Sequence, residues 1–312
     1  MEQIGLIVPC YNEEESINLF FQTTDKVFQS MNQAGPKYEP YYLFIDDGSS
    51  DHTLSEIKKL QVAHPDVVHY LSFSRNFGKE SAMAAGLKNV HGKYIAIMDV
   101  DLQDPPSLLP KMLQIINTED YDCVGCVQTA RKQNPLRAFL STSFYRVINW
   151  ISAVHIKPNV RDYRLMTRQY VDSVLELTEY NRFTKGIFSW VGFKTKYIEY
   201  QGVPRAAGKT HWSMYQLINY SLEGIVDFSD APLKLSTFVG LFSCFVSIIG
   251  LLFVIIRALF FGGSVAGWPS MVSVILLIGG IQLFCLGLVG NYIGKIYLET
   301  KDRPKYIVKE KK

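Results

Sequence analysis

The sequence predicts an α/β domain built on a mainly parallel sheet, followed by an interface helix and two transmembrane helices. Apolar runs alternate with helical patterns over roughly the first 130 residues, an order typical of a parallel sheet covered by helices. Between Lys234 and Lys295 lie sixty residues whose only charge is Arg257, which indicates membrane spans. Acidic clusters follow two predicted strands, at the sheet edge where α/β proteins bind ligands.

Composition limits the classes of protein that fit. The 312 residues are 48% hydrophobic and 20% charged, which excludes a disordered or fibrous protein and allows a large core. The net charge is +3, and the tail from Lys295 alone carries seven basic and three acidic residues. The rest of the chain is therefore close to neutral and gives no reason to expect nucleic acid as a partner. A basic tail beside a membrane segment predicts a cytosolic anchor.

Five cysteines at irregular spacing predict no disulfide framework. Cys123 and Cys126 form a C-x-x-C within a strand-like run, but no second pair or histidine stands at ligand spacing. Core packing is therefore favoured over zinc or redox use. The first apolar run, residues 4–8, is too short for a signal peptide, so we expect the region before the spans in the cytosol.

The first part of the chain predicts four strands with helices between them. The strands are apolar runs bounded by turn residues, at 4–8, 41–45, 67–73 and 94–98. One helix is predicted from about Glu13 with Asn12 as its N-cap, and a second starts after the turn at 46–51. A third helix is predicted at 79–90, and Pro105 and Pro106 suit the first turn of a fourth.

Beyond residue 130 the pattern is less regular. We expect a helix at 135–154, a short helix near 169–177, a strand at 194–200 and a loop at 201–211. Residues 213–228 carry apolar side chains at helical spacing, which predicts an amphipathic helix in the membrane interface.

The apolar region divides into two spans, at 235–256 and 271–292. Each is long enough to cross a ~30 Å hydrocarbon core at ~1.5 Å per residue. The connection carries at most Arg257, so the positive-inside rule places both ends in the cytosol. A soluble core is the alternative, disfavoured because the intervening loop is poor in polar residues. We therefore expect a cytosolic domain at 1–212, an interface helix at 213–230, a membrane segment at 231–294 with helices near 235–257 and 270–293, and a basic cytosolic tail at 295–312.

Asp99 and Asp101, with Gln103 and Asp104 close behind, are the sharpest local signal of chemistry. Two carboxylates at i and i+2 beyond the end of a strand can approach one divalent cation, because the turn re-aims side chains that a regular strand sends apart. Mg²⁺ or Mn²⁺ held in this way keeps positions open for phosphate oxygens. A solvated acidic turn is the alternative, but a second acidic cluster at the same sheet edge favours the metal.

Asp46 and Asp47 form that second cluster, after the second strand. A carboxylate there can accept hydrogen bonds from a ribose hydroxyl or a base N–H, and the alternative is a helix-capping turn. Neither a G-x-G-x-x-G nor a P-loop motif occurs, so neither a dinucleotide fold nor a P-loop is supported. A bound phosphate group would then be neutralised by a metal and by cationic side chains.

Four ordered motifs together carry a resemblance to a known family. They are Val8-Pro9-Cys10-Tyr11-Asn12-Glu13-Glu14, Asp46-Asp47-Gly48-Ser49, Ser74-Arg75-Asn76-Phe77-Gly78-Lys79 and Asp99-Val100-Asp101-Leu102-Gln103-Asp104-Pro105. The sequence resembles the family 2 glycosyltransferases of the GT-A fold. The two spans and Arg161-Asp162-Tyr163-Arg164 narrow the resemblance to the polyprenyl-phosphate glycosyltransferases, such as dolichol-phosphate mannose synthase and the bactoprenol glucosyltransferases. The similarity covers nearly the whole chain.

The resemblance implies roles for particular residues. The donor would be bound by Pro9, Tyr11, Glu13, Asp46, Asp47, Lys79, Asp99 and Gln103, with Asp99 and Asp101 as metal ligands. Asp162 and Asp101 would be catalytic, and Arg131, Arg137 and Ser141 would contact the acceptor phosphate. A solvated or lipid-facing surface is the alternative for the two arginines. Arg205, Lys209 and His211 would belong to a gate over the donor, where the family often has Lys in place of His211.

The resemblance also implies the reaction. It is the inverting transfer of a hexose from a nucleotide sugar to polyprenyl (undecaprenyl) phosphate at the cytosolic face of the plasma membrane, with Mg²⁺ or Mn²⁺ as cofactor. UDP-glucose is the expected donor, with N-acetylglucosamine or mannose as alternative sugars, and the product would serve cell-surface glycan modification. We also expect a homo-oligomer. Two alternatives come from other classes: a phosphatase with Asp99 as nucleophile, and a non-catalytic membrane scaffold. The phosphatase is disfavoured because its acidic pair would follow the first strand.

Overall fold

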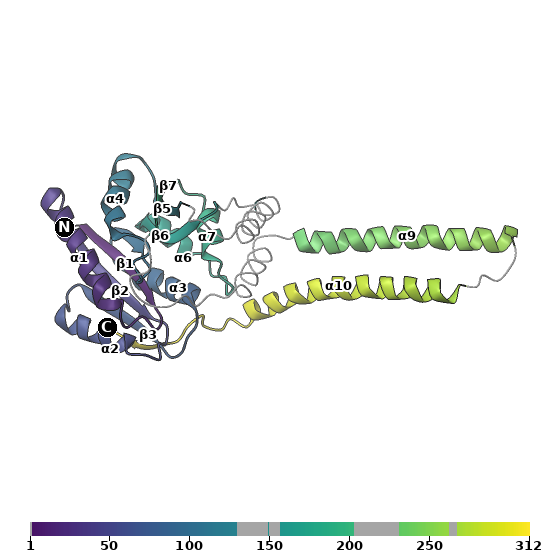
Figure 1. Cartoon of the computed structure of the whole chain (residues 1–312), viewed down its shortest axis with the longest axis horizontal. Helices are drawn as coiled ribbons and strands as arrows, with labels where there is room; N and C mark the ends of the chain where they lie inside the picture. The colour runs from purple at the N-terminus through teal and green to yellow at the C-terminus, as the bar shows by residue number, and fades with distance from the viewer. Residues whose placement is uncertain (1, 130–148, 150–156, 203–230, 262–266) are drawn as a thin grey trace.

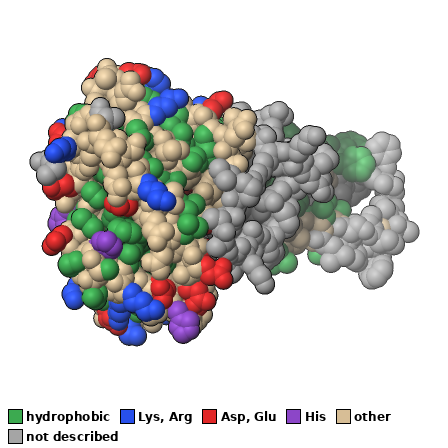
Figure 2. Space-filling view, turned by 60° about the vertical axis from the view of Figure 1, so that its left-hand side comes forward, with side chains coloured by type: hydrophobic (Ala, Val, Ile, Leu, Met, Phe, Trp, Pro, Cys, Tyr) green, Lys and Arg blue, Asp and Glu red, His purple; other side chains and the backbone are tan. Residues whose placement is uncertain are grey.

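A computed structural model of the chain describes residues 2–129, 149, 157–202, 231–261 and 267–312. The chain forms an α/β domain, from which two long helices extend side by side (Figure 1). Charged side chains of both signs are interspersed over the face of the domain shown in Figure 2. The helix expected at 135–154 and the interface helix expected at 213–228 lie outside the described residues, apart from residue 149, as does the expected loop beyond residue 202.

Eight strands of the described residues form one mixed sheet in the order β7-β5-β6-β4-β1-β2-β3-β8. The strands are β1 (Glu2–Cys10), β2 (Tyr38–Asp46), β3 (Val68–Phe73), β4 (Tyr94–Ile97), β5 (Cys123–Gln128), β6 (Val160–Thr167), β7 (Thr195–Tyr200) and β8 (Val308–Lys311). The neighbours β4, β1, β2 and β3 are parallel, as are β5 and β7. Strand β6 runs antiparallel to β4 and β5, and β8 runs antiparallel to β3. The predicted parallel arrangement therefore holds for the four strands that are central to the site.

The hydrophobic core lies in two layers, one on each face of the sheet. In β1, Leu6 and Val8 pack into one layer and Ile7 into the other, and all three are fully buried. A central strand buried on both faces is what an unbroken apolar run predicts. One face is covered by α1 (Ile17–Ala34), α2 (Thr53–Ala63) and, after the 3₁₀ turn η1 (Pro106–Leu108), α4 (Leu109–Thr118). The other face is covered by α3 (Lys79–Asn89), α6 (Arg168–Leu175) and α7 (Thr184–Trp190).

Two local predictions are wrong in detail. The first helix begins at Ile17 rather than near Glu13, and Asn12 is not its N-cap. Asn12 instead adopts a left-handed φ of 53°, and its Oδ1 accepts a hydrogen bond from Ser50 N at 2.8 Å. Tertiary contact with the turn after β2 therefore outweighs the local capping preference.

Strand β6 was not predicted, because polar residues interrupt the alternation that marks a strand. It contains Arg161, Asp162 and Arg164, and it inserts between β4 and β5. The other expected strands agree with the structure to within about three residues at each end. Cys123 and Cys126 are free and buried in β5, as expected for core packing.

The two long helices are α9 (Ala231–Phe261) and α10 (Trp268–Thr300), and the predicted spans lie within them. Each contains a window apolar enough to cross a membrane, at 233–250 and 277–300. Only 6% and 0% of these windows are buried within the chain, so neither helix is the core helix of a soluble domain. At ~1.5 Å per residue both helices exceed the ~30 Å thickness of a hydrocarbon core.

The basic tail returns to the α/β domain. Its last residues form β8, which pairs with the edge strand β3. The tail therefore completes the sheet, in addition to carrying the positive charge that the sequence shows.

Candidate active site

The site is built at the edge of the sheet where the parallel strands β1, β2 and β4 end. Pro9 pairs with Ile45, and Cys10 pairs with Asp46, so the segment after β1 lies beside the turn after β2. Asp99 follows the end of β4 by two residues. In β6, Arg164 pairs with Ile97, which places Asp162 across from Asp99 because the two strands are antiparallel. Residues far apart in sequence thus meet at one edge.

Asp46 and Asp47 are both buried, with 1% and 3% of their surface exposed. Asp46 accepts hydrogen bonds from Ser49 N at 3.1 Å and from Ser72 Oγ at 2.8 Å. Asp47 accepts from the backbone N–H groups of Phe77 and Gly78 at 2.7 and 2.9 Å. Burial raises the pKa of Asp47 to about 6, although these two N–H groups oppose the rise. The carboxylates are therefore fixed in position before any ligand arrives.

Gly48 is required in the turn that holds these acids. Its φ is +65°, a left-handed conformation that side chains other than glycine's adopt at a cost. A Cβ atom there would also lie 2.3 Å from the backbone carbon of Arg75. The turn after β2 and the segment before α3 are therefore packed backbone against backbone.

The segment after β1 is tied to the same turn. Asn12 N donates to Ser49 Oγ at 3.1 Å, and Glu13 N donates to Thr53 Oγ1 at 2.8 Å. Tyr11 is 39% exposed beside this turn. The predicted donor residues Pro9, Tyr11 and Glu13 are thus brought next to Asp46 and Asp47.

Lys79 lies between two predicted site acids. Its Nζ is 2.7 Å from Asp99 Oδ1 and 2.6 Å from Asp162 Oδ2. Burial opposes the charge on Lys79, but the two carboxylates outweigh it and raise its pKa. Burial likewise opposes the charge on Asp162, yet the nearby lysine holds the pKa of Asp162 below its usual range. Asp162 is therefore an ionised carboxylate at neutral pH.

Arg161 forms a second cationic contact that the sequence did not predict. Its side chain lies 3.2 Å from Asp104 Oδ1, 3.3 Å from Gln103 Oε1 and 3.9 Å from Asp99 Oδ2. Asp104 is 2% exposed and also accepts a hydrogen bond from the hydroxyl of Tyr200. The only sequence signal for Arg161 was its position next to Asp162.

The acidic turn after β4 has the chemistry of a partial metal site. Asp101 is 5% exposed, its Oδ1 accepts from Gln103 N at 3.1 Å, and Leu102 between them has a φ of 56°. Among the described residues, no group of three or more His, Cys, Asp or Glu side chains is placed to hold a metal. Mg²⁺ is commonly held by one or two carboxylates together with substrate phosphates, so Asp99 and Asp101 fit such an ion once a donor is bound. The ion would have to compete with Lys79 for Asp99.

Six predicted site residues lie outside the described residues, so their positions stay predictions: Arg131, Arg137, Ser141, Arg205, Lys209 and His211.

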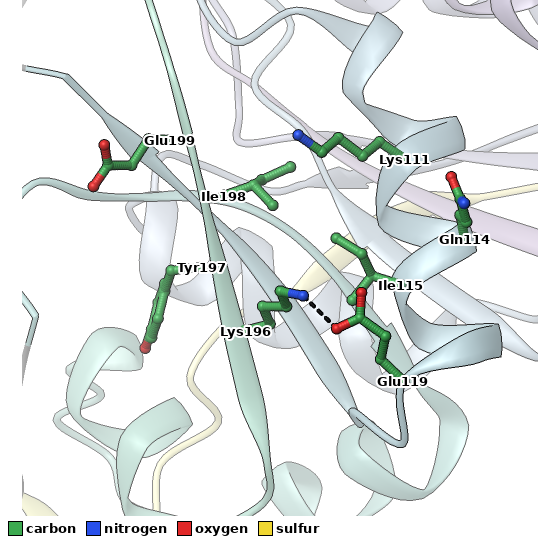
Figure 3. Close-up of a pocket in the computed structure, with 8 residues that line it drawn as sticks. All are labelled: Lys111, Gln114, Ile115, Glu119, Lys196, Tyr197, Ile198 and Glu199. Atoms are coloured by element: carbon green, nitrogen blue, oxygen red, sulfur yellow. Dashed lines mark hydrogen bonds and ion pairs between the residues drawn. The ribbon is translucent and has the colours of Figure 1, made fainter.

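A cavity of about 450 Å³ lies elsewhere, between α4 and β7 (Figure 3). It is lined by Lys111, Gln114, Ile115, Glu119, Lys196, Tyr197, Ile198 and Glu199, none of which is a predicted site residue. An ion pair between Lys196 and Glu119 joins its two sides. We therefore place the chemistry at the acidic sheet edge rather than in this cavity.

Comparison with known proteins gives two family matches. The model of glycosyl transferase family 2 matches residues 6–181, and the GtrB C-terminal hairpin matches residues 231–296. The bactoprenol glucosyl transferase of Shigella phage SfX is 42% identical over 311 residues, which cover 99% of this chain and 100% of that protein. A prophage bactoprenol glucosyl transferase homolog of Escherichia coli (strain K12) is also 42% identical, over 99% of each protein.

Solved structures are more distant. A mannosyltransferase from Pyrobaculum calidifontis in complex with GDP-Man and Mn²⁺ has a TM-score of 0.44 and 15% identity, and covers 94% of this chain and 87% of that one. Glucosyl-3-phosphoglycerate synthase from Mycobacterium tuberculosis has a TM-score of 0.43 and 17% identity, with 72% and 78% coverage. At these values the likeness carries no argument about donor, metal or acceptor.

Proposed function

Because this chain belongs to glycosyl transferase family 2, we propose that it transfers glucose from UDP-glucose to undecaprenyl phosphate at the cytosolic face of the membrane. The expected GT-A fold is confirmed by the same match and by the mixed sheet. The observation that carries the proposal is the meeting of the Asp46 and Asp47 turn, the Asp99 and Asp101 turn, and Asp162 at one sheet edge.

The donor nucleoside would lie against Pro9, Tyr11 and Glu13, with Asp47 accepting from the base and Asp46 holding the turn. The fixed backbone contacts of Asp47 support this role, because a carboxylate already in place loses little entropy on binding. Asp99, Asp101 and Gln103 would face the diphosphate, and Arg205, Lys209 and His211 would close over it. A divalent ion on Asp99 and Asp101 would supply Lewis-acid stabilisation of the leaving diphosphate.

In the reaction, an oxygen of the acceptor phosphate attacks C1 of the sugar. The bond from C1 to the diphosphate oxygen breaks, and the configuration at C1 inverts. A lipid phosphate with a second pKa near ~6 is largely dianionic at pH 7 and needs little help from a general base. Asp162, which Lys79 keeps ionised, is a weak base. We therefore assign Asp162 to orienting the acceptor and stabilising positive charge that develops on the sugar.

The two apolar helices give this reaction access to its acceptor. A polyprenol leaves the bilayer only at a cost of ~0.8 kcal/mol per CH₂, so the enzyme must work at the membrane surface. The bactoprenol glucosyl transferase relatives, aligned over the hairpin as well as the α/β domain, support this acceptor. Arg131, Arg137 and Ser141 would bind its phosphate. We further propose that the catalytic domain and both termini are cytosolic and that the chain forms a homo-oligomer.

The test is transfer by the purified full chain in detergent, with undecaprenyl phosphate and a panel of labelled nucleotide sugars, with and without Mg²⁺ or Mn²⁺. We expect metal-dependent appearance of a hexosyl phospholipid with UDP-glucose, identified by mass analysis of the extracted lipid. If the lipid instead carries N-acetylglucosamine or mannose, the reaction class stands and the proposal of glucose as the transferred sugar is wrong. Phosphate release without sugar transfer would favour a phosphatase, and nucleotide binding without any turnover would favour a scaffold.

Matched variants connect the test to the site. Asp101→Asn removes a proposed metal ligand and should lower transfer at least about 100-fold, since an electrostatic contribution of this kind is worth ~3 kcal/mol or more. Asp120→Asn changes an acid outside the proposed site, whose side chain is 92% exposed and forms an ion pair with Lys194. That variant should transfer like the wild type.

A further inference from the structure

The C-terminal segment connects the membrane helices to the candidate donor site. Helix α10 ends at Thr300 and β8 begins at Val308, so residues 301–307 alone join the two. Seven residues span at most ~25 Å. Figure 1 shows this segment running from α10 back to the edge of the sheet beside β3. In addition, Glu299 in the last turn of α10 accepts a hydrogen bond from Tyr180 N at 2.9 Å.

Strand β8 covers the edge strand that supports Asp46. Ser72 of β3 pairs with Glu310 of β8, and the Ser72 hydroxyl donates to Asp46 Oδ2 at 2.8 Å. Glu310 also forms an ion pair with Lys58 of α2. An uncovered edge strand has unpaired N–H and C=O groups, so β8 restrains the strand from which this contact comes.

A row of aromatic rings leads from the tail to Asp47. The ring of Tyr306 stacks on that of Phe73, with centroids 4.9 Å apart and planes at 14°. Phe73 in turn meets Phe77 edge to face at 5.8 Å. The backbone N–H of Phe77 donates to Asp47 Oδ1 at 2.7 Å. The segment after β3 is held from the tail side as well, because Ser74 N donates to Ile307 O at 3.0 Å.

We propose that Tyr306 is a positioning residue for the donor nucleotide. It fixes Phe73 and Phe77, and through them it fixes the two backbone N–H groups that orient Asp47. The tail is then a part of the donor site as well as a membrane anchor, and the site is assembled only when the chain has crossed the membrane twice and returned. This inference rests on the proposed function, because it takes Asp47 as a nucleotide ligand.

The test compares three substitutions in the full chain, with UDP binding measured by calorimetry and transfer kinetics measured in parallel. Tyr306→Leu keeps an apolar side chain but loses the planar ring, and Tyr306→Phe keeps the ring. Lys311→Ala removes the contact of Lys311 Nζ with Asn89 Oδ1 at 2.9 Å on the same tail without touching Phe73. Thermal unfolding of each variant reports whether the fold is intact.

We expect Tyr306→Leu to weaken UDP binding and raise the donor KM by roughly 3- to 10-fold, the loss typical of one aromatic pair. Its kcat at saturating donor and its KM for the lipid should stay close to wild type. Tyr306→Phe and Lys311→Ala should bind UDP normally. A wild-type UDP affinity in Tyr306→Leu overturns the inference. The inference is also overturned if kcat, lipid affinity and thermal stability of this variant fall as much as its UDP affinity does. A wild-type chain that binds no nucleotide overturns the proposed function first, and the inference with it.

Discussion

Lys79 connects two acids to which the sequence gives different roles. Asp99 was expected on the metal and Asp162 in catalysis, and the lysine contacts both at 2.7 and 2.6 Å. Lys79 itself was expected only to bind the donor. A cation shared by two carboxylates neutralises a cluster that would otherwise repel itself and the donor diphosphate. We therefore propose that Lys79 also supports the role of Asp162.

The role of Asp162 can be tested by Asp162→Asn. This variant keeps the size of the side chain but removes its charge, so the transition state loses an electrostatic contribution worth roughly 3 kcal/mol. We expect kcat to fall by about 100-fold or more, while donor affinity from calorimetry changes little. Unchanged turnover would show that Asp162 is not catalytic.

Asp47 predicts a pH dependence of donor binding. Its pKa of about 6 means that the carboxylate becomes protonated as the pH falls from 7 to 5, and the neutral carboxyl group is a weaker acceptor for a base N–H than the carboxylate. If only the ionised form binds, UDP affinity should fall by up to about tenfold over this range. Asp47→Asn should bind weakly and show only the titration of the nucleotide itself. An identical pH profile in both proteins would contradict the assignment.

The raised pKa of Asp47 also makes the free energy of unfolding depend on pH. The ordinary pKa of Asp47 is 3.8, and the folded value is about 6. Between these two values the folded chain binds more protons at this residue than the unfolded chain does. The contribution of Asp47 to the free energy of unfolding therefore decreases as the pH rises from about 4 to about 6.

At the scale of elements, α3 positions Lys79 through its close packing on β1. A Cβ atom at Gly86 would lie 2.2 Å from Cγ2 and 3.2 Å from Cβ of Ile7, which is fully buried. The helix can approach the sheet this closely only because residue 86 has no side chain. Lys79, at the start of the same helix, is thereby brought within reach of Asp99 and Asp162.

Gly86→Ala therefore should destabilise the protein, even though alanine is the better helix former. Overpacking of a rigid core costs typically ~1–3 kcal/mol, which exceeds the gain of ~1 kcal/mol in helix propensity over most of that range. We expect a lower Tm in detergent and a weaker transferase activity. Gly35→Ala is the matched control, because a Cβ there meets nothing within 4 Å. A Tm for Gly86→Ala at or above that of the control would contradict the packing argument.

At the scale of the whole molecule, β8 restricts how the chain can cross a membrane. Helix α9 follows the α/β domain, and the strand after α10 pairs with β3 of that same domain. Both ends of the hairpin must then lie on the side of the catalytic domain. The positive charge of the tail predicts which side that is, namely the cytosol.

Cysteine labelling in intact cells measures this arrangement. Gly267→Cys, between the two helices, should react with a membrane-impermeant maleimide added outside the cell. Lys312→Cys, next to β8, should react only after the cells are permeabilised. The unsubstituted chain provides the background from its own cysteines. Labelling of both positions from the same side would contradict a hairpin that crosses twice.

The sequence by itself determined the fold class, the two apolar helices and the residue types of the site. Apolar runs such as residues 4–8 and 94–98 are strong local signals, because a strand buried on both faces needs an unbroken apolar segment. A stretch of sixty residues with one charge is equally direct, because it is long and apolar enough for two helices that each match the thickness of a hydrocarbon core. The motifs at Asp46 and Asp99 could also be recognised in the sequence, because their acidic residues directly follow apolar runs that predict buried strands.

Only the tertiary structure decided how these pieces meet. The contact of Lys79 with Asp162 joins residues 83 positions apart, and the stack of Tyr306 on Phe73 joins the tail to the third strand. Strand β6 and the late start of α1 have the same origin, because both depend on partners from elsewhere in the chain. Local sequence patterns indicate which side chains of a segment are buried. The partner of a strand in the sheet depends on which distant segment satisfies the hydrogen bonds and charges of that strand. This choice is made only when the whole chain folds.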